Sequence, residues 1–204
     1  MYTVKSPWLL KAAYPSLIWK FPVHLNEVYI TFDDGPHEEI TPFVLDALQK
    51  YNAKATFFCL GKNVDANKKV YSNILKEGHK VGNHTYNHYS GWKTTDEIYL
   101  KDVMKAKKVI SSNLFRPPYG RIGRFQIQQL KKFFNIIMWD VLSGDFDVKL
   151  SPEKCLHNVI RNTKPGSIIV FHDSEKAFKR LEYALPRVLE NFADKGYNCK
   201  PIVI

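Results

Sequence analysis

The segment VYITFDDGP (28–36) joins a short apolar run to two aspartates, a glycine and a proline. Its first part, VYITF (28–32), is rich in β-branched and aromatic residues, which is typical of a buried strand. The segment TPFVLDALQKY (41–51) follows with a helical pattern, for which we expect Thr41 as N-cap and Pro42 at the first helical position. A strand followed closely by a helix is the repeating unit of an α/β fold.

The same alternation continues along the chain. Further strands are expected at 55–60, 80–84, 114–118, 135–141, 167–172 and 198–204, and further helices at 64–76, 95–111, 124–132, 152–162 and 177–194. This order predicts parallel pairing through right-handed crossovers. About seven such units fit a single-domain, distorted (β/α) barrel better than an open sheet, which stays an alternative. We expect an N-terminal arm over residues 1–27 and one domain over 28–204.

Composition narrows the classes of partner. The formal net charge is +10, which would suit an anionic partner, but the basic residues are spread along the whole chain and favour an ordinary solvated surface. No nucleic-acid-binding motif accompanies the charge, so no specific nucleic-acid partner is expected. Three cysteines, far apart and without a CxxC pair, indicate neither a disulfide framework nor a thiolate metal site. The pattern does not indicate an oligomeric state.

The arm is aromatic and apolar over residues 8–23, but Lys11, Pro15 and Lys20 interrupt it. It is too broken for a membrane span or the apolar region of a signal peptide. No export signal is visible, which by itself would indicate a cytoplasmic protein, but the localisation stays open. Contact with a membrane surface is the less favoured alternative, and we expect the domain to bury Trp8, Leu9, Leu10 and Trp19.

Polar residues follow several of the predicted strands directly. In (β/α) barrels the C-terminal ends of the strands carry the chemistry, so these residues should face one mouth. They are Asp33, Asp34, His84, Arg116, Asp145 and His172.

Asp33 and Asp34 are adjacent carboxylates, which repel each other. One can be held as a metal ligand while its neighbour serves as a base. The alternative is an ordinary Asp-Asp-Gly-Pro turn.

His84 and His88 form an H-x-x-x-H pair, and on a helical turn both imidazoles would share one face. With a carboxylate they complete a His₂-Asp set with an open position, as catalytic zinc requires. Because the chain has seven histidines, a chance pair is the alternative. The zincin pattern HExxH is absent, since Thr85 follows His84, and the zinc-deaminase pattern HxE…PCxxC is absent as well.

Arg116 lies in RPPYG (116–120), where two prolines make the backbone rigid and could aim the guanidinium at a carboxylate. His172 ends an apolar strand and precedes Asp173. The alternative for Arg116 is an ordinary surface arginine. The alternative for His172 is a buried core histidine whose hydrogen bonds are satisfied.

Together these segments resemble, in order and spacing, the five motifs of the polysaccharide deacetylase (NodB-like) family, which includes peptidoglycan N-acetylglucosamine deacetylases and chitin deacetylases. The resemblance covers roughly residues 28–200. The segments are TFDDGP (31–36), HTYNH (84–88), RPPYG (116–120), WDVLSGDF (139–146) and IVFHD (169–173).

The resemblance implies a hydrolase that removes N-acetyl groups from N-acetylglucosamine-type residues of a polysaccharide or oligosaccharide. It implies Asp33 as general base, and Asp34, His84 and His88 as ligands of one divalent metal. Zinc is the default metal for this ligand set, with cobalt, nickel and iron as alternatives. The partner would be an acetylated amino-sugar glycan, and such substrates of the family usually lie outside the cytoplasm.

The resemblance assigns four further roles. Arg116 would orient Asp33, and Tyr119 would offer its backbone N–H to the oxyanion. Asp145 would pair with His172, the general acid that protonates the departing amine.

Three residues depart from the family pattern. Leu142 stands where the family often has Asp, Phe146 where it has Trp, and Val170 where a Leu usually lines the acetyl pocket. The substrate subclass is therefore open. The alternatives are a hydrolase of a non-sugar amide or O-acetyl ester, and a non-catalytic carbohydrate-binding relative. The retained base, acid and ligands argue against the last.

Overall fold

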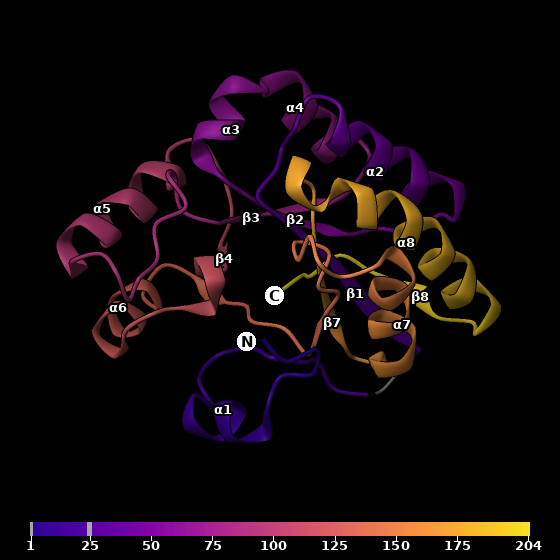
Figure 1. Ribbon diagram of the computed structural model, residues 1–204. Helices are drawn as coiled ribbons and strands as arrows, with labels where there is room; N and C mark the ends of the chain where they lie inside the picture. Colours follow the sequence, from indigo (N-terminus) through magenta and orange to yellow (C-terminus); the bar gives the residue numbers. More distant parts are fainter. Residues whose placement is uncertain (1, 24–25) are drawn as a thin grey trace.

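A curled parallel sheet forms the centre of the protein (Figure 1). The computed structural model describes residues 2–23 and 26–204. The strands follow the order β5-β4-β3-β2-β1-β7-β6, and β8 pairs with β1. Every pair of these strands is parallel, and the sheet curls into a half-barrel, which confirms the expected distorted barrel of about seven strands. The strands are β1 Glu27–Asp33, β2 Thr56–Cys59, β3 Lys80–Asn83, β4 Leu114–Phe115, β5 Asn135–Ile136, β6 Val141–Leu142, β7 Ile168–His172 and β8 Asn198–Cys199.

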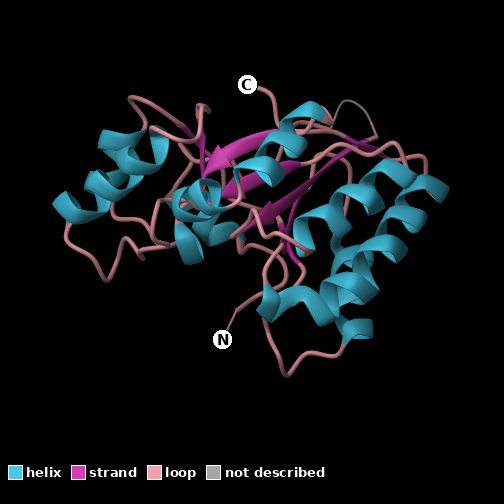
Figure 2. Cartoon of the chain, turned by 90° about the horizontal axis from the view of Figure 1, so that it is seen from above, coloured by secondary structure: helices cyan, strands magenta, loops and turns pink. Residues whose placement is uncertain are grey.

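Helices surround this sheet (Figure 2). The largest buried apolar cluster joins β1, β2 and β7 to the helices α2, α7 and α8. The helices are α1 Trp8–Ala13, α2 Ile40–Lys50, α3 Gly61–Ala66, α4 Lys68–Lys76, α5 Asp96–Lys107, α6 Arg124–Leu130, α7 Pro152–Asn162 and α8 Glu175–Asp194, with a 3₁₀ turn η1 at Pro118–Gly120.

The strand register brings the ends of neighbouring strands to one edge. Asp33 at the end of β1 is the register partner of His172 at the end of β7. Asn83 at the end of β3 is the partner of Phe115 in β4, so the residues that follow them, His84 and Arg116, leave the sheet at the same level. Parallel pairing therefore gathers the predicted site residues at the carboxyl ends of the strands.

Two helix predictions need correction. The helix expected over 64–76 is two helices, α3 and α4, which meet at Asn67, whose side-chain amide donates to the carbonyl of Pro36. Thr41 does not cap α2, which begins at Ile40. Its hydroxyl instead donates to a carboxylate oxygen of Asp173, 2.5 Å away. In both cases the side chain makes a tertiary hydrogen bond instead of the role that the local sequence pattern predicted for it.

The run expected as one strand over 135–141 is divided between β5 and β6, which lie at opposite ends of the sheet. Residues between them pair with the arm: the N–H of Met138 donates to the carbonyl of Ile18 at 2.7 Å. The N–H of Ile18 in turn donates to the carbonyl of Ile136 at 3.0 Å. An apolar run cannot tell whether one neighbour or two will pair with it. The closing strand expected over 198–204 is strand only in β8.

The arm lies across the gap between β5 and β6. Lys5 forms an antiparallel bridge with Val141 of β6, and Ile18 forms a parallel bridge with Ile137, next to β5. The N–H of Leu142 donates to the carbonyl of Val4 at 2.8 Å. The arm thus supplies hydrogen-bond partners to both outer strands of the sheet.

The prediction that the arm's apolar residues are buried is right for Trp19, which is 9% exposed, and wrong for α1. Trp8, Leu9 and Leu10 are 73%, 62% and 46% exposed. The cause is Lys11, whose ammonium lies 2.6 Å from a carboxylate oxygen of the buried Asp140. Because that lysine faces the domain, the apolar side of α1 faces outward.

Among the described residues, none of the helices is both long and apolar enough to span a lipid bilayer.

Candidate active site

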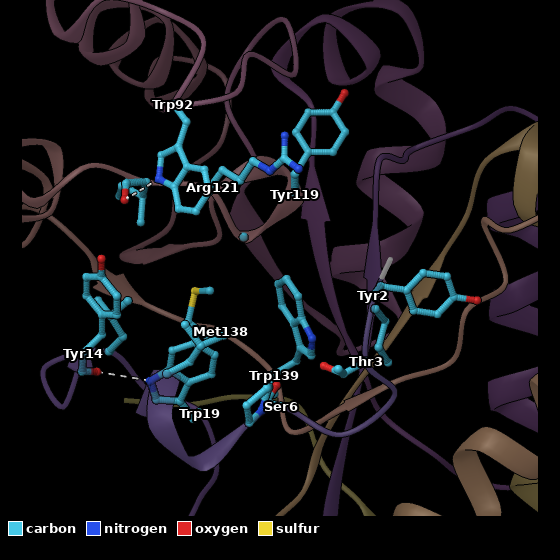
Figure 3. Close-up of a pocket in the computed structure, with 16 residues that line it drawn as sticks. Tyr2, Thr3, Ser6, Tyr14, Trp19, Trp92, Tyr119, Arg121, Met138 and Trp139 are labelled. Atoms are coloured by element: carbon cyan, nitrogen blue, oxygen red, sulfur yellow. Dashed lines mark hydrogen bonds between the residues drawn. The ribbon is translucent and has the colours of Figure 1, made fainter. Parts of the chain in front are cut away.

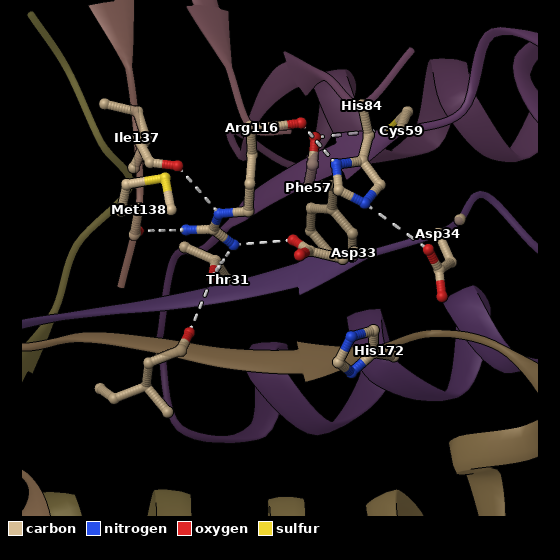
Figure 4. A network of polar contacts seen from close by, with 12 residues as sticks. Thr31, Asp33, Asp34, Phe57, Cys59, His84, Arg116, Ile137, Met138 and His172 are labelled. Atoms are coloured by element: carbon tan, nitrogen blue, oxygen red, sulfur yellow. Dashed lines mark hydrogen bonds and ion pairs between the residues drawn. The ribbon is translucent and has the colours of Figure 1, made fainter. Parts of the chain in front are cut away.

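Asp33 and Arg116 form a buried ion pair (Figure 4). Nη1 of Arg116 lies 2.7 Å from Oδ1 of Asp33 and also donates to the hydroxyl of Thr31. Its Nε and Nη2 donate to the carbonyls of Ile137 and Met138 at 3.2 and 3.0 Å. The Arg116 side chain is completely buried, so it is not a surface arginine. This set of contacts fixes the guanidinium and aims one nitrogen at Asp33.

Asp34, His84 and His88 converge on one point. Oδ1 of Asp34 lies 3.7 Å from Nε2 of His84 and 3.2 Å from Nε2 of His88. Ligand atoms about 2.0–2.2 Å from a tetrahedral zinc ion lie roughly 3.4 Å apart, so the spacing suits one ion. The Oδ1 atom is buried and satisfies no hydrogen-bond geometry with the described residues. A buried carboxylate oxygen between two imidazole nitrogens fits a divalent cation.

His84 is held in a form that suits a metal ligand. Its Nδ1 atom lies 2.7 Å from the carbonyl oxygen of Arg116, an acceptor, so Nδ1 carries the proton and Nε2 presents its lone pair. Burial lowers the pKa of His84 to about 4, against the opposing carboxylates. Burial works to raise the pKa of Asp34, but His88, His172 and His84 hold it well below its usual range. Near neutral pH this pair is therefore a neutral imidazole and a carboxylate.

The site concentrates unusual backbone conformations. Asp34, Thr85, His88 and Tyr119 all have positive φ angles, from 60° to 82°. Such angles are uncommon outside glycine and gather at functional sites. The segment 84–88 is accordingly not a helical turn, as the H-x-x-x-H spacing suggested. The two imidazoles meet through a tight loop instead, with ring centroids 5.2 Å apart.

Asp102, which the sequence did not single out, holds this histidine loop. One carboxylate oxygen accepts from the backbone N–H groups of Tyr86 and Asn87 at 2.8 and 2.9 Å, and the other accepts from the Asn87 amide. Asp102 lies in α5 and is buried beside Val103. The sequence did contain one sign of this role, since Asp102 falls on the apolar face of a helix that is otherwise rich in lysine.

His172 is paired with Asp145. Nδ1 of His172 lies 2.8 Å from Oδ1 of Asp145, and the backbone N–H of His172 donates to Oδ2 at 2.7 Å. Burial works to lower the pKa of His172, but Asp145 and the more distant carboxylates raise it to about 10. The ring of Phe146 packs edge-on to the imidazole, with centroids 5.3 Å apart. His172 is thus a protonated imidazole beside an apolar wall.

Neighbouring aspartates have other partners. Asp140 binds Lys5, Lys11 and the hydroxyl of Ser167. Asp173 accepts from Thr41 and from the backbone N–H of Gly35 at 3.0 Å, and burial raises its pKa to about 7. A Cβ atom at Gly35 would lie 2.0 Å from Asp173, so only glycine fits there. Sequence order alone did not reveal that Asp173 anchors the Asp-Asp-Gly-Pro turn.

Arg180 is a second supporting residue that the sequence did not indicate. It is buried in α8, and its Nε donates to the carbonyl of Asp145 at 2.5 Å. This contact supports the loop that carries Asp145.

Tyr119 stands at the edge of the site, within η1. Its ring packs against that of His88, with centroids 4.6 Å apart. The next residue, Gly120, has a φ of +64°, and a Cβ atom there would lie 2.6 Å from the indole of Trp139. The turn after Pro118 therefore requires glycine at this position.

Several known proteins resemble this chain in sequence. The sequence profile of the polysaccharide deacetylase family matches residues 22–133. A peptidoglycan-N-acetylglucosamine deacetylase of Bacillus cereus is 36% identical over 197 residues, which are 93% of this chain and 70% of the relative. A chitooligosaccharide deacetylase of Azorhizobium caulinodans is 30% identical over 72% of this chain and 74% of its own length.

The fold is also shared. A crystal structure of a peptidoglycan N-acetylglucosamine deacetylase, in complex with 4-naphthalen-1-yl-N-oxidanyl-benzamide, superposes with a TM-score of 0.88 at 31% identity. The match covers 97% of this chain and 95% of the other. The chain therefore belongs to the polysaccharide deacetylase family.

Proposed function

We propose that this protein is a metal-dependent hydrolase that removes the N-acetyl group from N-acetylglucosamine-type residues of a glycan. One observation carries the proposal: a His₂-Asp cluster stands at the same edge of the sheet as a carboxylate held by an arginine and an imidazole held by a carboxylate. A carboxylate and an imidazole held beside one metal site can serve as base and acid.

The base is Asp33. Arg116 fixes its position in a buried site, where the carboxylate can accept the proton of an attacking water. The acid is His172, which Asp145 keeps protonated. It gives its Nε2 proton to the departing amine, since Nδ1 is held by Asp145. The backbone N–H of Tyr119 is assigned to the oxyanion of the tetrahedral intermediate.

Asp34, His84 and His88 would hold one divalent metal, for which zinc is the default with this ligand set. When bound, the metal polarises the acetyl carbonyl and lowers the pKa of a water molecule. The carbonyl of Arg116 orients His84 for this role, so one residue supports both the base and a ligand.

An acetylated amino-sugar glycan is the proposed substrate because relatives named for peptidoglycan and chitooligosaccharides match most of this chain. The test is acetate release by the zinc-loaded protein from chitooligosaccharides, peptidoglycan fragments and acetylated xylan. Release from either of the first two supports N-deacetylation of amino sugars. Release from xylan alone would replace this with an O-acetyl esterase, and no release from any glycan would contradict the proposal.

A further inference from the structure

A cleft of about 320 Å³ opens beside the active site, and the N-terminal arm builds one of its walls (Figure 3). Leu10, Tyr14 and Trp19 form this arm wall. Trp92 and Arg121 stand on the opposite side, and Trp139 lies between the two walls. The volume is within the range of ligand sites, about 300–1,000 Å³. We call this space the arm cleft.

Two residues link the lining of the arm cleft to the catalytic site. Tyr119 lines the cleft and also packs against His88. Tyr2 lines it as well, and its ring lies 5.0 Å from that of Phe146, which in turn contacts His172. A chain molecule with one acetylated unit at the metal ligands would therefore extend past Tyr119 into the cleft.

Hydrogen bonds hold two tryptophan rings of the cleft, one of them exposed and the other largely buried. Trp92 is 65% exposed, yet its indole N–H donates to the carbonyl of Ile122 at 3.1 Å. Across the cleft, the indole N–H of Trp19 donates to the carbonyl of Tyr14 at 3.1 Å. An exposed tryptophan held in one orientation offers a preformed flat surface at little entropic cost to a ligand.

This lining suits a sugar ring. A pyranose presents C–H groups on its faces and hydroxyls around its rim, so it needs aromatic surface with a few polar groups at the edge. The indole of Trp92 supplies the surface, and the guanidinium of Arg121, 5.6 Å from the centre of that ring, supplies hydrogen-bond donors. We propose that the arm cleft binds the sugar residue next to the one that is deacetylated. The inference rests on the proposed function, because it names the neighbour of that substrate unit.

The arm offers matched controls for a test. Leu10 lines the cleft, whereas Leu9, also exposed, does not. Trp92 lines it, whereas the exposed Trp8 does not. Leu10→Arg and Trp92→Ala would obstruct or remove part of the cleft, and Leu9→Arg and Trp8→Ala are the controls.

The experiment measures kcat/KM for N-acetylglucosamine, which has no neighbouring sugar, and for the chito-oligosaccharide of four sugar units. For the two cleft variants, the ratio of the longer to the shorter substrate should fall about tenfold, as expected for losing ~1.4 kcal/mol of binding. The two control variants should keep the wild-type ratio. An equal loss on both substrates, or a loss in the controls as large as in the cleft variants, would overturn the proposal.

A second measurement does not depend on catalysis. Calorimetric titration of the metal-free wild-type protein with chitotetraose should show binding that Trp92→Ala weakens and Trp8→Ala does not. If acetate is never released but Trp92→Ala alone weakens binding, the proposed function fails and the proposal of a sugar-binding cleft is supported. If acetate is released and both variants bind like wild type, the cleft proposal fails alone.

Discussion

Both oxygens of the Asp145 carboxylate are used by one residue, His172. Oδ1 lies 2.8 Å from Nδ1 of the imidazole, and Oδ2 accepts the backbone N–H of the same residue at 2.7 Å. A carboxylate held twice in this way cannot rotate away from the ring. The histidine therefore keeps both its orientation and its positive charge.

Asp145→Asn should move the alkaline limb of the pH–rate profile toward lower pH. Asp145 raises the pKa of His172, so replacing the charge by a neutral amide of similar shape lowers that pKa. The protonated acid is then lost earlier as pH rises, and the rate at neutral pH falls. The acid limb and the metal content should not change.

The predicted shift is tested by comparing the pH–rate profile of purified Asp145→Asn with that of the wild-type protein. An alkaline limb that stays in place or shifts upward contradicts the pairing. Since coupled groups share their titration, the limbs describe the site as a whole.

Asp33→Asn and Asp34→Asn should separate base from ligand. The Asp33 variant should retain the metal and lose most of its kcat, because an amide cannot accept the proton of water. A general base typically contributes about 10²–10⁴-fold, which sets the scale of the loss. The Asp34 variant should bind metal more weakly, since its buried oxygen faces both imidazoles. Elemental analysis beside steady-state rates tests both, and the reverse pattern would exchange the two roles.

Zinc should stabilise the protein against heat, and His88→Ala should abolish that effect. A ligand that binds only the folded state at one hundred times its Kd adds about 2.7 kcal/mol. The measurement is the shift in Tm between chelated and zinc-loaded protein. His157→Ala is the control, because this histidine is exposed on α7 and its imidazole hydrogen-bonds to the backbone carbonyl of Glu153. A zinc-induced shift that survives in His88→Ala would remove His88 from the ligand set.

Strand positions and the site's location could be predicted from sequence because they depend on local signals. VYITF and SIIVF are apolar runs long enough to be recognised, and β1 and β7 lie where these patterns place them. The polar residue after each strand then marks the carboxyl edge of the sheet. The parallel register of β1 and β7 then makes Asp33 and His172 neighbours at that edge.

The supporting contacts could not be predicted because they join residues that are distant in sequence. Asp102 serves a loop 15 and 16 residues before it, and Arg180 serves Asp145 from 35 residues away. The outward orientation of α1 has the same origin. It depends on the ion pair of Lys11 with Asp140, 129 residues later, which no periodicity in the arm reveals.

Arg116→Ala should be among the most destabilising substitutions in this chain. It leaves the Asp33 carboxylate buried without its cation, and it leaves the carbonyls of Ile137 and Met138 without donors. Breaking a buried ion pair from one side costs about 3–5 kcal/mol. Arg116→Lys should recover only part of this, since an ammonium can stay near Asp33 but cannot reach all four acceptors of the planar guanidinium.

Urea denaturation measures the free energy of unfolding for both Arg116 variants, with Arg124→Ala as the control. Arg124 is exposed at the start of α6, so its loss should change the stability by no more than about 0.5 kcal/mol. Arg116→Lys should also lose kcat, because Asp33 is no longer held in one orientation. If Arg116→Ala unfolds at the same urea concentration as Arg124→Ala, the buried pair does not stabilise the fold. If Arg116→Lys keeps full kcat, the position of Asp33 does not depend on the guanidinium.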